Sequence, residues 1–77
     1  MTDKEWQEEL EWREEFVHMV KRKLVARNMK RRELAKAAGI SENTMSRYMR
    51  RQRTPSASVV ARIADALDCS VDELTKF

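Results

Sequence analysis

The sequence has very few of the residues that build tight turns or disulfides. Glycine, proline and cysteine each occur once among its 77 residues. So little glycine and proline leaves few positions for hairpin turns, which favours an all-α fold over one with sheets. The lone cysteine, Cys69, excludes a disulfide within these residues, and we expect it to be buried as a small hydrophobic side chain.

Long apolar runs and clustered catalytic residue types are also missing. No apolar run approaches the roughly 18 residues of a membrane span, and the acidic N-terminus is unlike a signal peptide. His18 is the only histidine, with no second histidine or cysteine at ligand spacing. No serine or cysteine has a credible base and orienting partner. We therefore expect no enzyme activity, no metal, no cofactor and no membrane partner.

Charge is abundant but segregated along the chain. Residues 1–15 contain seven acidic and two basic residues, whereas residues 21–53 contain twelve basic and two acidic residues. A basic block next to an acidic block indicates a polyanionic partner for the first and repulsion of the second from that partner. A length of 77 residues predicts one domain.

Apolar spacing near the N-terminus predicts a long helix from about Asp3 to about Asn28. Its stripe consists of Trp6, Leu10, Val17, Val20 and Leu24. Residues 1–15 form an acidic helical extension, and the pattern leaves open whether they continue this helix or break from it.

Two short helices are predicted in the middle of the chain, over residues 31–38 and about 42–50. Gly39 suits the left-handed turn between them, Ser41 is a good N-cap, and Ala35 is small enough for a helix crossing. The second helix has an apolar face of Met45, Tyr48 and Met49, and a polar face of Asn43, Ser46, Arg47 and Arg50. A cationic second helix favours a DNA-binding helix-turn-helix, with a plain αα-hairpin as the alternative.

The sequence also resembles a known family. The elements Leu34-Ala35, Gly39-Ile40-Ser41, Met45-Ser46 and Pro55 look like the helix-turn-helix of phage repressors (lambda repressor/Cro, Xre-type). VVARIADALDCSVDEL, residues 59–74, resembles that family's last two helices. The resemblance covers about residues 16–77 and implies a compact five-helix, lambda-repressor-like DNA-binding domain. The chain departs from the family at Arg31, which replaces a glutamine, and at Met49 and Arg51, which replace a glutamate and a glycine.

The resemblance implies a sequence-specific regulator of transcription, in particular a repressor, whose helix 42–50 enters the major groove of double-stranded DNA. The base contacts that we expect are Ser41, Glu42, Asn43, Thr44, Ser46 and Arg47. The phosphate contacts that we expect are Arg31, Tyr48, Arg50, Arg51 and Arg53. For Tyr48, a core position with a solvated hydroxyl is the alternative.

The family usually binds DNA as a two-fold dimer, so we expect a homodimer in the bacterial cytoplasm, associated with the nucleoid and encoded by the bacterium or by a phage. Trp6, Leu10 and Trp12 are the predicted dimer contacts, and packing of the tryptophans on the fourth or fifth helix is the alternative. A second functional hypothesis is a protein-interaction module, antitoxin- or adaptor-like, that captures a partner with its acidic N-terminal helix.

Overall fold

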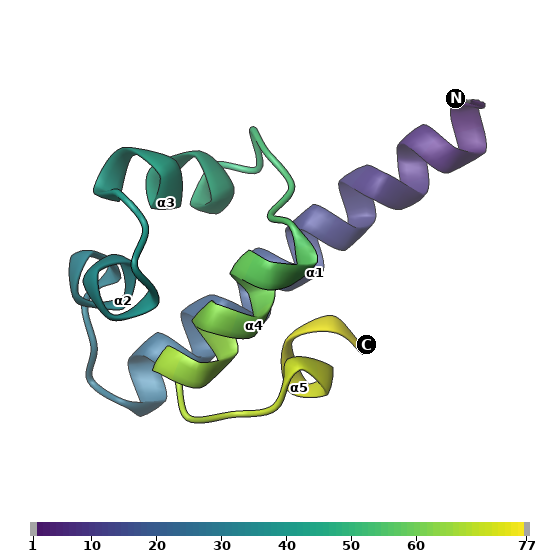
Figure 1. Ribbon diagram of the computed structural model, residues 1–77. Helices are drawn as coiled ribbons and strands as arrows, with labels where there is room; N and C mark the ends of the chain where they lie inside the picture. The colour runs from purple at the N-terminus through teal and green to yellow at the C-terminus, as the bar shows by residue number, and fades with distance from the viewer. Residues whose placement is uncertain (1, 77) are drawn as a thin grey trace.

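Five helices make up the computed structural model, which describes residues 2–76 (Figure 1). They are α1 (Asp3–Ala26), α2 (Arg31–Ala38), α3 (Glu42–Met49), α4 (Ala57–Ala66) and α5 (Val71–Thr75). No strand occurs among the residues described, and the predicted all-α, five-helix fold is confirmed.

The first helix is continuous, so residues 3–15 extend it without a break. Thr2 caps it: the hydroxyl accepts from the backbone N–H of Glu5 at 3.2 Å, and the Glu5 carboxylate accepts from the Thr2 N–H at 3.4 Å. The helix ends at Ala26, two residues before the predicted end, and the chain then turns through Asn28 with φ of 52°. The N-terminal end of α1 projects beyond the other helices (Figure 1).

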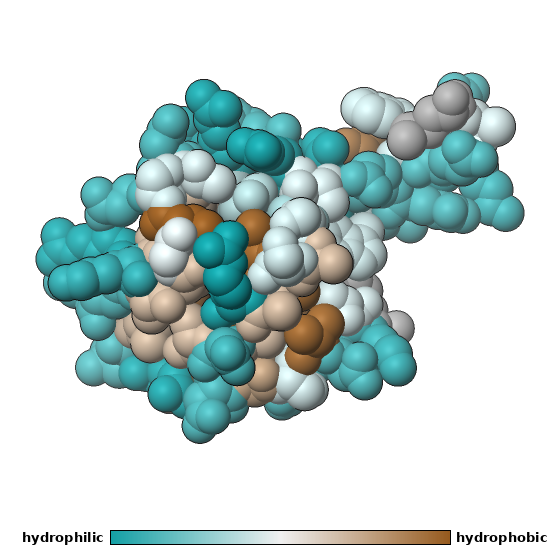
Figure 2. Space-filling model, viewed as in Figure 1, coloured by the Kyte–Doolittle hydropathy of each residue, from teal (hydrophilic) through white to brown (hydrophobic). Residues whose placement is uncertain are grey.

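One hydrophobic core joins all five helices. Its buried members are Phe16, Val17, Val20, Leu24, Leu34, Ala35, Ala38, Met45, Tyr48, Met49, Val59, Val60, Ile63, Ala64, Leu67 and Leu74. Within the core, α2 packs against α3 and α4, while α1 packs against α3 and α5. The projecting part of α1 contributes none of the fully buried residues, and its surface is mostly hydrophilic (Figure 2).

The turn between α2 and α3 has the predicted geometry. Gly39 lies in the left-handed region with φ of 72°, and the N–H of Ile40 donates to the Ala35 carbonyl at 3.0 Å. Ala35 has no exposed surface, and Ser41 accepts from the Thr44 N–H at 3.0 Å. These contacts fix the angle between α2 and α3.

Two side chains beside the core, Trp12 and Cys69, are only partly buried, and for Cys69 this corrects the expected burial. Trp12 stacks on Phe16, with ring centroids 5.1 Å apart and an interplanar angle of 7°, and packs against the core. It is therefore partly covered within its own chain, and a dimer contact through Trp12 stays a prediction. Cys69 is only partly buried, because it lies in the turn after α4 rather than inside a helix. Partial burial, together with the nearby Glu73 carboxylate, raises the pKa of the Cys69 thiol above its usual value, so the thiol stays protonated at neutral pH.

Candidate nucleic-acid interface

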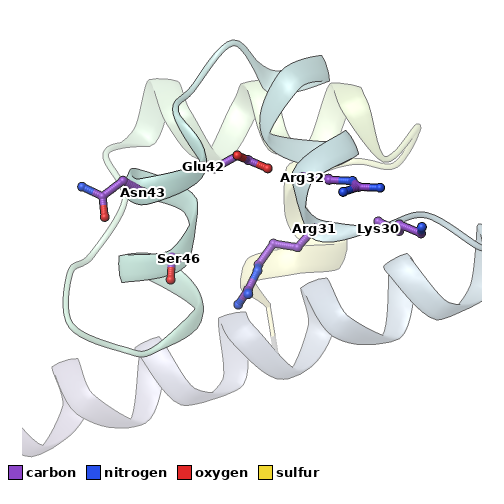
Figure 3. Close-up of a pocket in the computed structure, with 6 residues that line it drawn as sticks. All are labelled: Lys30, Arg31, Arg32, Glu42, Asn43 and Ser46. Atoms are coloured by element: carbon purple, nitrogen blue, oxygen red, sulfur yellow. The ribbon is translucent and has the colours of Figure 1, made fainter.

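A concavity of about 540 Å³ lies between the start of α2 and the outer face of α3 (Figure 3). Its lining residues are Lys30, Arg31, Arg32, Glu42, Asn43 and Ser46. Every one of them carries a polar or charged side chain, and half of them are cations. Three of these residues were predicted as base contacts and one as a phosphate contact, so the fold brings these four together, while the other predicted contacts do not line the concavity.

The core fixes which side of α3 faces outward. Met45, Tyr48 and Met49 on its inner side are 1%, 4% and 6% exposed. The side chains of Glu42, Asn43 and Arg47 are exposed on the other side. Because the apolar residues hold the helix in one rotation about its axis, the polar residues are presented together on a rigid element.

The side chains at the start of α3 differ in whether their hydrogen-bonding groups are already engaged within the protein. In Figure 3, Glu42 extends toward α2 while Asn43 points away from it. The Ser41 hydroxyl is engaged in the helix cap, since it accepts from the Thr44 N–H and donates to the Thr44 hydroxyl at 2.8 Å. Asn43 and Glu42 are thus available to an external partner, whereas Ser41 and Thr44 are already bonded to each other.

The first residue of α2 is Arg31, whose side chain reaches into the space between α2 and α3 on the side of Ser46 (Figure 3). Lys30 and Arg32 beside it were missed by sequence reasoning, although their position next to Arg31 at a helix start was a usable signal. Cations at the positive end of a helix dipole oppose the charge that the dipole favours. Glu33 offsets part of this, because its carboxylate accepts from the Lys30 N–H at 3.3 Å.

The loop after α3, which is the helix predicted to enter the DNA groove and is called the recognition helix, adds cations at its C-terminal end. Arg50, Arg51 and Arg53 are all exposed. Tyr48, in contrast, lies in the core. The burial of Tyr48 disfavours the predicted phosphate contact and agrees with the alternative, in which Tyr48 occupies a core position.

Neither a metal-binding cluster nor a membrane-spanning helix occurs among residues 2–76. No group of three or more histidine, cysteine, aspartate or glutamate side chains there is arranged to hold a metal ion. No helix in the same range is long and apolar enough to cross a membrane.

Helix α3 with one buried face, the left-handed turn at Gly39 before it, and the cationic outer surface together define a helix-turn-helix DNA-binding domain. Residues 19–77 match the family of Cro/C1-type HTH DNA-binding domains, and the chain belongs to this family. The match begins three residues after the predicted boundary near residue 16. No curated protein and no solved structure matches the chain significantly.

Proposed function

We propose that this protein is a sequence-specific regulator of transcription that places α3 in the major groove of double-stranded DNA. One observation carries the proposal: Glu42, Asn43 and Ser46 of α3 line the same concavity as the cationic start of α2. A groove-reading helix needs base-edge donors and acceptors on one side and phosphate-binding cations beside them.

Base recognition is assigned to the exposed side chains at the N-terminal end and outer face of α3. Asn43 has the donor and acceptor that pair with adenine N7 and N6, and Arg47 has the fork that pairs with guanine O6 and N7. Glu42 can accept from the cytosine amino group. Ser46 lies deeper in the concavity, where its hydroxyl can donate or accept. Ser41 and Thr44 contribute secondary contacts through the lone pairs and hydrogen that their mutual bond leaves free.

Phosphate binding is assigned to two clusters of cations that flank α3. The first lies at the start of α2, where Arg31 and its neighbours Lys30 and Arg32 combine with the helix dipole to favour an anion. The second is the loop with Arg50, Arg51 and Arg53. A phosphate at the start of α2 would neutralise cations that the dipole otherwise disfavours, so DNA binding is expected to stabilise this helix.

The decisive experiment is selection of binding sites from random duplex DNA, followed by affinity measurements over a salt gradient. We expect one enriched sequence and a log–log salt slope of about −0.9 for each phosphate contact. Binding without any enriched sequence would reduce the proposal to non-specific DNA binding. Absence of salt-dependent binding would overturn the proposal entirely.

Repression is the direction of regulation that the family resemblance favours. A reporter gene carrying the selected site within its promoter should lose expression when the protein is present. The same reporter with a scrambled site is the control. A rise in expression from the selected site would make the protein an activator instead.

We further propose a homodimer that uses Trp6 and Leu10. Their side chains are 53% and 41% exposed on the projecting part of α1, an unusual exposure for large apolar groups so close together. A double variant, Trp6→Ala with Leu10→Ala, should sediment as a monomer where the wild type sediments as a dimer. A wild-type monomer would instead leave this surface to a different protein partner and overturn the dimer proposal.

A further inference from the structure

The loop from α3 to α4 holds its arginines in a backbone conformation that needs support. Arg51 has φ of 63°, in the left-handed region that residues other than glycine rarely adopt. The N–H of Arg51 donates to the Tyr48 carbonyl at 3.0 Å, and the N–H of Gln52 donates to the Arg47 carbonyl at 2.9 Å. These two bonds attach the start of the loop to the end of α3. They do not involve Thr54 or the Arg51 carbonyl, which are bonded elsewhere.

Arg13, near the middle of α1, supplies that support. The Nε of Arg13 donates to the Thr54 hydroxyl at 2.6 Å, and its Nη1 donates to the Arg51 carbonyl at 3.4 Å. These bonds join positions that are 41 and 38 residues apart in the chain. Figure 1 shows the loop returning to the middle of α1 at this point.

Glu9 completes the arrangement on the preceding turn of α1. Its carboxylate accepts from the Thr54 hydroxyl and lies 3.7 Å from the Arg13 Nε. The side chains of Arg13 and Glu9 are 19% and 34% exposed, so solvent screens this pair only in part. We call the three bonded residues Glu9, Arg13 and Thr54 the Arg13 brace.

Resting on the proposed function, we propose that Arg13 is a positioning residue for DNA binding. The Arg13 brace holds the α3–α4 loop so that Arg51 and Arg53 lie beside the recognition helix. Only molecules with the loop in this conformation bind with full affinity, so the apparent affinity falls with the fraction that adopts it. Both α1 residues of the brace precede residues 19–77, so the family match does not account for this role.

Arg13 acts through the loop rather than on DNA. Its guanidinium is bonded to Thr54 and to the Arg51 carbonyl, and the Glu9 carboxylate lies next to it. A phosphate would have to displace these partners and approach a carboxylate. The cations left exposed by the same arrangement are Arg51 and Arg53.

The test compares Thr54→Val with Thr54→Ser on random-sequence duplex DNA at low salt. Valine has the shape of threonine without the hydroxyl, and neither change alters the net charge. We expect Thr54→Val to weaken binding about three- to tenfold, as a loop held in roughly a third to a tenth of the molecules requires. Thr54→Ser keeps the hydroxyl and should bind like the wild type.

Two further measurements separate positioning from general stability. Arg13→Ala should weaken binding by a similar factor, while Lys4→Ala removes the same charge from the same helix and should have a smaller effect. Amide hydrogen exchange in Thr54→Val should quicken at Arg51 and Gln52 but not in the core. Quickened exchange across the whole chain would mean a purely structural role and overturn the inference.

Each remaining outcome has a distinct meaning. If Thr54→Val binds DNA as tightly as the wild type, the Arg13 brace has no role in binding, although DNA binding by α3 stands. If Arg13→Ala weakens binding while Thr54→Val does not, Arg13 contacts phosphate directly and the inference is wrong. A wild-type protein that binds no DNA overturns the proposed function itself.

Discussion

The two halves of α1 share one backbone helix but have opposite surroundings. Residues 16–26 contain four core side chains, whereas residues 3–15 contain none and carry seven acidic residues. A segment as short as the first half is marginally helical in water when isolated. Its helicity therefore depends on the Thr2 cap, on continuity with the buried half, and on the contacts of Trp12 and Arg13 with the body of the domain. The helical backbone continues along all of α1, whereas its fully buried side chains all lie within residues 16–26, where other helices pack against it.

The largest expected difference between the two halves of α1 is in the effect of truncating one aromatic residue from each. Phe16 is 1% exposed and Trp6 is 53% exposed. Phe16→Ala should lower the free energy of unfolding by about 3–5 kcal/mol, because it leaves a cavity in the core. Trp6→Ala should change the free energy of unfolding by no more than about 0.5 kcal/mol in the monomer. Urea unfolding measures both, and similar losses for the two variants would contradict the division of α1.

A second prediction compares two alanines on α2. Ala35 is fully buried on α2, which packs against α3 and α4, whereas Ala37 is exposed. Ala35→Leu should destabilise the protein by about 1–3 kcal/mol through overpacking, and Ala37→Leu should be close to neutral. Thermal unfolding followed by circular dichroism distinguishes them. Equal melting temperatures for the two variants would contradict tight packing around Ala35.

A third prediction compares an arginine on α3 with one in the following loop. Arg47→Ala should cost about 1–3 kcal/mol of binding free energy on the selected site and relax the preference at one base pair. Arg53→Ala should weaken binding to selected and random DNA alike and reduce the salt slope by about one. A uniform loss across sequences for Arg47→Ala would make Arg47 a phosphate contact.

The smallest predicted effect concerns the buried half of α1 and its contact with α5. Lys23 donates to the Glu73 carboxylate at 2.9 Å and the Ser70 N–H donates at 2.8 Å, and both bonds lower the pKa of the Glu73 carboxyl. A lowered pKa stabilises the fold above the ordinary glutamate pKa, and this stability is lost as the pH falls through the lowered value. Glu73→Gln should therefore lower the melting temperature slightly at neutral pH, and the difference should vanish in acid. Glu11→Gln, on the exposed half, removes the same charge from a residue that makes neither of these two bonds and is the control.

Local features of the fold were predictable from the sequence because they depend on neighbours three or four residues away. The caps at Ser41, Ser56 and Ser70 and the left-handed turn at Gly39 all follow from residues beside them. The bounds of α2 were predicted to the residue, and those of α3 to within one.

Long-range features were not predictable in the same way. Trp6 and Trp12 lie in the same acidic segment, but only Trp12 reaches the body of the domain, where it stacks on Phe16 and lines a hollow with residues of α4 and α5, while Trp6 is exposed. The bond from Arg13 to Thr54 spans 41 residues and leaves no trace in local periodicity. Lys30 and Arg32 were missed for another reason: exposed cations look alike in a sequence until a fold places them beside the recognition helix.

Left-handed backbone at helix ends has a consequence for the balance between stability and activity. Four residues have a positive φ among those described, and only Gly39 is a glycine. Asn28 and Asp68 have short polar side chains that tolerate this conformation, but Arg51 does not. Arg51→Gly should raise the melting temperature, with a gain of up to about 1 kcal/mol, while weakening DNA binding through the lost cation. Position 51 is thus a point where the chain gives up stability to keep a charge, and engineering a more stable variant there would select against its activity.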